Sequence, residues 1–294
     1  MVDPMFMLSL MRGDKLPIVA GCQVLLNAYR LLAKPIVIDG NFGPDTQEAT
    51  KLLQKQNKLK PTGIIDAATW QILARGNRLS VHDSVDVFDP TMNKEVEALK
   101  AGGAQPGIVG GMCNGVAQLQ GLLAFAGVKP GKLVLLRFQG HGNRGKQVLS
   151  YGTGDHLIFD AIRREAVPQI HRSPDQYDFP KNEIAATRLE MHYSGLSLKN
   201  LADPAVAHEF VRIAPYFHPF GSVEFHGCQV GGGADGERFL QRVADLLRVP
   251  AVGALHKQYM EQPMRYHGPA RVRCPGSEDL RTWAKKLPEI RSYD

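Results

Sequence analysis

Ile36-Val37-Ile38-Asp39-Gly40-Asn41-Phe42-Gly43-Pro44-Asp45-Thr46 is the stretch that decides the fold of the N-terminal part of this sequence. Its two glycines and its proline predict a tight loop, and Asp45 or Thr46 stands where it can cap a following helix. Before the loop, apolar residues recur at helical spacing over residues 18–32. A second apolar helical stretch follows the loop. We therefore predict two helices joined by a tight turn.

A second turn repeats this arrangement at Thr62-Gly63-Ile64-Ile65-Asp66-Ala67-Ala68-Thr69-Trp70. Asp66 stands at the N-cap position of a short third helix, which we expect to end near Leu73. The two turns and the three helices together predict a small all-α domain over residues 12–76.

These two turns resemble the peptidoglycan-binding domain family that is found on many cell-wall hydrolases. The pattern D-G-x-F-G-x-x-T is followed by a helix ending in L-Q-K-Q and then by T-G-I-I-D-x-x-T-W. The resemblance implies that the domain binds the glycan or the stem peptide of peptidoglycan. Turn chemistry accounts for the glycines and Asp39, and we expect Phe42 and Trp70 in the core of the domain rather than at a ligand. The residues that carry the match are Asp39, Gly40, Phe42, Gly43, Thr46, Asp66, Thr69 and Trp70.

Residues 77–107 have the composition of a linker. Charged and polar residues are mixed there with Gly102-Gly103 and Pro106-Gly107, and Gly110-Gly111 follows. Residues 79–88 alternate like a strand, so the position of the boundary is open by many residues. We place the start of the second domain near residue 108.

Residues 108–294 show the pattern of an α/β domain. Residues 133–138 form a mostly apolar run, as expected for a strand inside a parallel sheet. Residues 223–225 and 249–255 predict further buried strands, and an amphipathic helix lies between them. Alternation of strands and helices predicts a mostly parallel sheet with helices on both faces.

Two of the predicted strands end in residues suited to acyl-transfer chemistry. His141 follows the strand at 133–138, and Cys228 follows the strand at 223–225. Reactive groups collect at the carboxyl ends of strands in open α/β sheets. If the strands are neighbours, the imidazole can take the proton of the thiol and later pass it to a leaving amine. Gly142 and Gly227 would let the substrate reach backbone N–H groups that stabilise an oxyanion. His226 is a possible second base, although strand alternation directs it away from Cys228.

The positions of His141 and Cys228 resemble those in caspase-like cysteine peptidases, which pair a strand-end His-Gly with a later strand-end Cys. The resemblance implies a caspase-like fold and a His/Cys dyad that cleaves amide bonds. Two features depart from the caspase pattern. The two residues are 87 positions apart, against roughly 50 in caspases, and His226-Gly227-Cys228 replaces Gln-Ala-Cys. The second departure leaves the preferred substrate open.

Two other functions fit the same sequence. Met112-Cys113-Asn114-Gly115 resembles the nucleophile helix of NlpC/P60 wall endopeptidases, where the helix dipole favours the thiolate. That family has a histidine at the start of the next strand, whereas the corresponding segment here begins at Gln147. The third interpretation is a non-catalytic adaptor that binds peptidoglycan and a partner. The reactivity of Cys113 relative to Cys228 separates these interpretations.

Composition narrows the partners and the location. The net charge is +6, but no basic block is interleaved with aromatic residues, so nucleic acid is not an expected partner. The four cysteines lie far apart without a CxxC pair, so we expect no zinc site, and the site needs no cofactor. The first ten residues lack a signal-peptide pattern, and no apolar run is long enough to span a membrane. We expect peptidoglycan and a protein or peptide substrate as partners, with synthesis in the cytoplasm. Three routes to peptidoglycan stay open: export by a dedicated secretion system, phage-linked lysis, and action on wall fragments in the cytoplasm.

Overall fold

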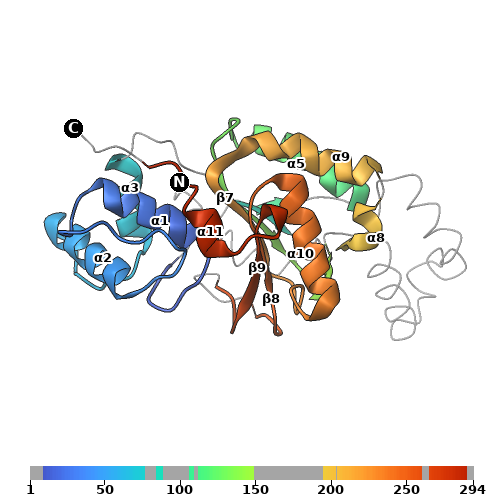
Figure 1. Ribbon diagram of the computed structural model, residues 1–294. Helices are drawn as coiled ribbons and strands as arrows, with labels where there is room; N and C mark the ends of the chain where they lie inside the picture. The colour runs from blue at the N-terminus through green and yellow to red at the C-terminus, as the bar shows by residue number, and fades with distance from the viewer. Residues whose placement is uncertain are drawn as a thin grey trace, which may run out of the picture.

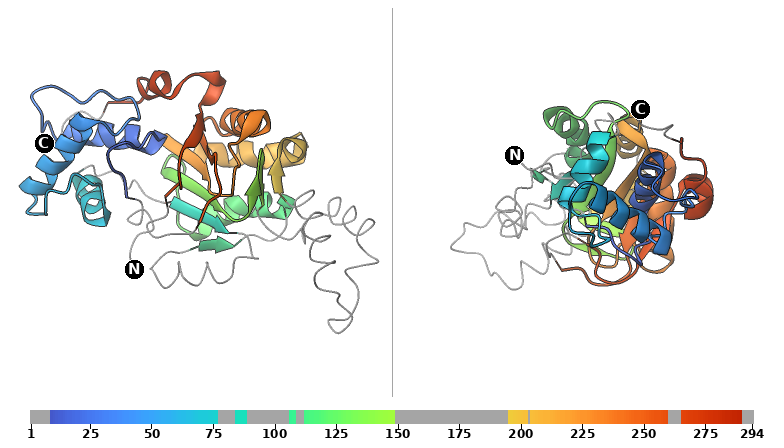
Figure 2. Two further views of the ribbon diagram at one scale, coloured as in Figure 1. Left: turned by 90° about the horizontal axis from the view of Figure 1, so that it is seen from below. Right: turned by 90° about the vertical axis from the view of Figure 1, so that its left-hand side faces the viewer.

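A unit of three helices lies at one end of an open, mostly parallel sheet (Figure 1). The computed structural model describes residues 9–76, 84–88, 106–108, 112–148, 195–202, 204–259 and 265–289. The left view of Figure 2 again shows the three N-terminal helices beyond one end of the sheet, and in the right view they lie in front of it. The sheet and its covering helices form the larger part of the described chain.

The three N-terminal helices are α1 (Pro17–Ala28), α2 (Pro44–Gln56) and α3 (Ala67–Gly76). α2 begins directly at Pro44, because the fixed φ of proline suits the first helical position. The expectation that Asp45 or Thr46 caps this helix is therefore wrong, since both lie within its first turn. The expected cap of α3 is confirmed, because an Asp66 carboxylate oxygen accepts a hydrogen bond from Thr69 N at 2.9 Å.

Two buried glutamines hold the two turns of this unit. Gln23 of α1 accepts hydrogen bonds from the backbone N–H groups of Asp39 and Gly40, and its amide donates to the Asp39 carboxylate, each at 2.9 Å. Gln54 of α2 accepts from Gly63 N at 2.9 Å and donates to Ile64 O at 2.8 Å. Each amide thus satisfies loop groups that would otherwise be buried without partners.

The aromatic residues of the motif belong to the core, as expected. Phe42 and Trp70 are each 1% exposed and pack in the cluster of apolar residues that the three helices share. Thr46 and Thr69 are also buried, and their hydroxyl groups accept hydrogen bonds from Gln23 and Gln54. The motif therefore specifies the shape of this unit.

The central sheet has the strand order β2-β1-β3-β7-β8-β9. Its strands are β1 (Ser84–Phe88), β2 (Pro106–Ile108), β3 (Leu133–Gln139), β7 (Phe217–Phe225), β8 (Ala251–Ala254) and β9 (Ala270–Arg273). All neighbouring pairs are parallel except β8 and β9. The chain passes from β2 to β3 across β1, so the strand order reverses between β1 and β3, as in doubly wound folds.

The segment expected to be a linker contributes to this sheet. β1 lies inside residues 77–107, and β2 crosses the end of this range. The α/β region therefore begins before residue 108. Both strands are short, and pairing with β3 and with each other supplies the hydrogen bonds that stabilise them. Each strand has few apolar residues, and glycine and polar residues surround them in the sequence. For this reason the sequence predicted a linker here.

One face of the sheet is covered by helices of the α/β region. These are α5 (Met112–Phe125), α8 (Leu198–Leu201), α9 (Pro204–Ile213) and α10 (Gly233–Leu247). They enclose a core that includes Phe138 of β3 and Phe225 of β7, whose rings stack at 5.0 Å between centroids. Short 3-10 turns lie at Ala214–Tyr216 and Pro275–Ser277. A separate antiparallel sheet contains β4 (Gly142–Asn143), β5 (Lys146–Val148) and β6 (Gly195–Ser197).

Of the N-terminal unit, α1 packs on the other face of the sheet. α1 packs against β7, and α11 (Leu280–Ala284) lies beside it. Leu135 of β3 and Phe220 of β7 join the same buried cluster as the N-terminal helices. A Cβ at Gly21 of α1 would lie 2.8 Å from Phe220 Cδ2, so glycine permits the close approach of the helix. Helices therefore lie on both faces of a mostly parallel sheet, and the N-terminal helices share an apolar cluster with one of these faces.

Candidate functional site

His141 and Cys228 lie at the same edge of the sheet. β3 and β7 are adjacent and parallel, and Phe138 is the register partner of Phe225. The residues that follow these strands therefore leave the sheet side by side. The structure brings together the two strand ends that carry the predicted His141 and Cys228.

Gly142 and Gly227 form the closest contact between these strand ends. A Cβ at Gly142 would lie 2.8 Å from the Cα of Gly227, and a Cβ at Gly227 would lie 2.9 Å from the Cα of Gly142. These distances are too short for any side chain, and backbone atoms cannot withdraw as a flexible side chain would. The two glycines are needed for direct contact between the loops.

Gln147 connects the same two loops with hydrogen bonds. Its side chain is fully buried, its amide donates to His141 O at 3.2 Å, and its carbonyl oxygen accepts from Gly227 N at 2.9 Å. Sequence analysis did not select Gln147, because an isolated glutamine in a short strand carries no local signal of such a role. The only indication was its position six residues after His141.

The hydrogen bond to Gln147 changes the expected oxyanion donors. Gly227 N–H already donates to Gln147 Oε1, so it is not available as the oxyanion donor that the sequence predicted. Cys228 N–H makes no hydrogen bond to any described residue. Within the described part of the chain, Cys228 N–H is therefore the backbone donor next to the thiol that a substrate oxygen can use.

The thiol of Cys228 is partly buried and held by one neighbouring residue. Its Sγ accepts a hydrogen bond from Gln258 N at 3.3 Å and lies 3.8 Å from Gln258 O. The His141 side chain is exposed, and no hydrogen bond between its imidazole and Sγ is formed among the described residues. The loops are in contact, and the two side chains are not hydrogen-bonded to each other in this structure.

The other described cysteines are unsuited to act as nucleophiles. Cys22 and Cys274 are buried. Burial raises the pKa of Cys22 well above its usual value and raises the pKa of Cys274 to about 12. Both thiols stay protonated at neutral pH, and a thiol must lose its proton to attack.

Cys113 occupies a different part of the same edge. It is the second residue of α5, which follows the edge strand β2. β1 separates β2 from β3, whose end leads to His141. The side chain of Cys113 lies outside the described part of the structure. The topology therefore pairs His141 with Cys228 more directly than with Cys113.

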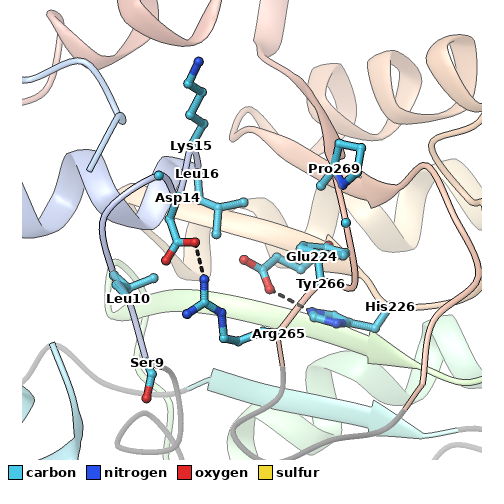
Figure 3. Close-up of a pocket in the computed structure, with 13 residues that line it drawn as sticks. Ser9, Leu10, Asp14, Lys15, Leu16, Glu224, His226, Arg265, Tyr266 and Pro269 are labelled. Atoms are coloured by element: carbon cyan, nitrogen blue, oxygen red, sulfur yellow. Dashed lines mark hydrogen bonds and ion pairs between the residues drawn. The ribbon is translucent and has the colours of Figure 1, made fainter. Parts of the chain in front are cut away.

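His226 points to another site. It is buried directly after the end of β7, its Nε2 lies 2.9 Å from Glu224 Oε2, and its ring stacks on Tyr266 at 4.3 Å between centroids. These contacts place the imidazole in a pocket of about 230 Å³ between residues 9–16 and the sheet (Figure 3). His226 therefore contacts Glu224 and Tyr266. Strand alternation is not the reason, because residues two positions apart share a face of a strand and β7 already ends at Phe225.

An ion pair joins the two walls of this pocket. Asp14, from the segment before α1, pairs with Arg265, from the segment before β9 (Figure 3). Burial raises the pKa of Asp14, and the charge of Glu224 adds to this rise against the opposing effects of Met11 N–H and Arg265. The pocket therefore contains charged groups from both the helical unit and the sheet.

The N-terminal unit also has a hollow of its own. A cavity of about 340 Å³ lies beside the end of α1 and the connection to α2, with the exposed cations Arg30 and Lys34 at its border. Arg30 has a φ of 50°, a left-handed conformation that is uncommon for this residue type. The motif residues Phe42, Thr46, Thr69 and Trp70 are buried and do not line this hollow.

Residues 17–73 match the family model of the putative peptidoglycan binding domain. This range falls within the predicted domain at 12–76 and includes both turns of the motif. No curated protein and no solved structure matches the chain. The chain thus contains an N-terminal peptidoglycan-binding domain, and this match supports association with the cell wall. No helix in the described ranges is long and apolar enough to cross a membrane.

Proposed function

We propose that this protein is a cysteine hydrolase that acts on the cell wall. The peptidoglycan-binding domain holds the wall, and Cys228 and His141 cleave an amide bond in a wall-associated protein or in the peptidoglycan stem peptide. The observation that carries the proposal is the contact between Gly142 and Gly227, which Gln147 reinforces. It keeps the two strand ends with the required side chains together.

The proposed reaction has two steps. His141 takes the thiol proton as Cys228 Sγ bonds to the amide carbonyl carbon, and the C–N bond then breaks while the imidazolium gives its proton to the leaving amine. Water next attacks the thioester, with the neutral imidazole taking one of its protons, and release of the acid restores the thiol. Cys228 N–H faces the developing oxyanion in both steps.

The resemblance to caspase-like peptidases supports this reaction. That family pairs a strand-end His-Gly with a later strand-end Cys, and here the two strands are parallel neighbours. Ligands of doubly wound sheets bind beyond the carboxyl ends of the strands. Cys228, His141 and the glycines between them all occupy that edge.

Thiol labelling and single substitutions test the proposal. A small iodoacetamide probe at neutral pH is expected to label Cys228 first in the native chain, with Cys22 and Cys274 unlabelled because they are buried. Cys228→Ala and His141→Ala are each expected to remove release of new amines from purified peptidoglycan or envelope protein. Their double variant should lose no more than either single variant, because the two residues act as one unit.

The controls distinguish the alternative functions. Cys113→Ala should retain full activity, and both active-site variants should keep their thermal unfolding midpoint and their sedimentation with peptidoglycan. Loss of activity only in Cys113→Ala would transfer the reaction to the helix nucleophile. Full activity in Cys228→Ala would refute the proposed dyad.

A further inference from the structure

The pocket near Asp14 and Glu224 is built from both parts of the molecule. The segment over residues 10–16 pairs with the motif loop of the peptidoglycan-binding domain: Phe42 N donates to Asp14 O at 2.8 Å, and Leu16 N donates to Gly40 O at 3.0 Å. The opposite wall is formed by β7 and by residues 265–270. A ligand in this pocket would touch the motif-loop segment and the sheet at once.

Glu224 presents an unused acceptor to this pocket. The residue is 1% exposed, and its Oε1 has no hydrogen-bond partner among the described residues. Its other oxygen is held by His226 at 2.9 Å, and Arg137 is its register partner on the neighbouring strand β3. Buried acceptors are normally satisfied, so an unpartnered carboxylate oxygen on a residue that lines a cavity marks a place where a ligand donor would gain a partner.

The remaining walls favour a cation on an aliphatic chain. Leu10, Leu16 and Pro269 supply apolar surface beside the carboxylates, and Figure 3 shows Lys15 directed away from them. The Tyr266 hydroxyl donates to Val252 O at 3.2 Å, and burial raises its pKa well above the usual value, so the ring stays neutral. Its flat ring adds to the apolar wall. The methylene groups of such a ligand would pack on this apolar wall, and its cationic end would pair with the Glu224 carboxylate.

We propose that this pocket binds the side-chain ammonium of a diamino acid in the peptidoglycan stem peptide, with Glu224 as its main partner. Asp14 supplies a second acceptor whose charge is partly balanced by Arg265. The match of residues 17–73 to a peptidoglycan-binding family supports this choice of ligand. The inference requires binding alone and is independent of hydrolysis.

Calorimetric titration with two matched probes tests the inference. The full chain with Cys228→Ala is titrated with a disaccharide tripeptide that carries a free side-chain amine, and with the same compound after N-acetylation of that amine. We expect the free amine to bind at least 10-fold more tightly. Glu224→Gln keeps the shape of the side chain and should weaken binding of the free amine about 10- to 100-fold, as for a hydrogen bond to a charged group.

Two further variants make the result decisive. Asp235→Asn, which removes an exposed carboxylate on α10, should leave the preference unchanged. Asp14→Asn should reduce the preference several-fold, and it replaces Glu224→Gln as the deciding variant if the latter does not fold. Equal binding of the two probes, or an unchanged preference in the deciding variant, would overturn the inference. Because every titrated chain lacks the thiol, these results do not depend on the proposed reaction.

Discussion

Gly21→Ala tests whether α1 is seated on the sheet as described. In an exposed helix this substitution stabilises by about 0.5–1 kcal/mol, because alanine restricts the unfolded chain. Here the new Cβ would lie 2.8 Å from Phe220 Cδ2. The Phe220 ring cannot easily withdraw, since it is buried and packs on the His218 ring at 3.9 Å between centroids. Overpacking of a core typically costs about 1–3 kcal/mol, so we expect net destabilisation of about 1–2 kcal/mol.

Urea unfolding followed by circular dichroism measures this change, and Gly121→Ala is its matched control. Gly121 lies within α5, and a Cβ there would meet no atom of the described residues within 4 Å. The control should therefore stabilise the chain by about 0.5–1 kcal/mol. If Gly21→Ala stabilised the protein as much as Gly121→Ala does, the close packing of α1 on β7 would be refuted.

Three further predictions concern stability. Burial lowers the pKa of His218 from 6.5 to about 4, so between pH 4 and 6.5 the unfolded chain binds more protons at this residue than the folded chain does. The free energy of unfolding should therefore fall by about 3 kcal/mol as the pH drops from 6.5 to 4. A series of urea titrations at different pH values should show a smaller fall in His218→Gln. Asp66→Ala should cost about 1 kcal/mol by removing the cap of α3, and Asp45→Ala, which removes no cap, should cost less in the same assay. Gly227→Ala should cost about 1–3 kcal/mol because its Cβ would lie 2.6 Å from Gln147 Oε1, and an unchanged thermal midpoint would contradict the described loop contact.

The parts of the fold predicted from sequence are those with a strong local pattern. β3 and β7 are apolar strands within the expected regions, and the cap at Asp66 follows from its place before a helical stretch. His141 and Cys228 were placed at strand ends by the same reasoning, and their strands are neighbours. The proposed catalysis remains a prediction.

The parts not predicted depend on contacts between distant residues. β1 and β2 are stabilised by pairing along the sheet, so their surroundings resembled a linker. Gln23, Gln54 and Gln147 satisfy loop groups far away in sequence, and a glutamine alone gives no sign of its partner. Gln23 is a polar residue at a buried position of the apolar helix α1, and this position indicates that its amide has a buried partner.

The apolar cluster that α1 shares with β7 also sets how far the peptidoglycan-binding domain lies from the thiol. A flexible linker of about thirty residues would let two domains vary their separation over about 30 Å. With α1 seated on β7, the peptidoglycan-binding domain is instead held in one position relative to the sulfur of Cys228. Under the proposed function, the cleaved bond would lie at a constant distance from the point of attachment. A wall of different mesh size would therefore offer a different number of cleavable bonds, even with identical chemistry.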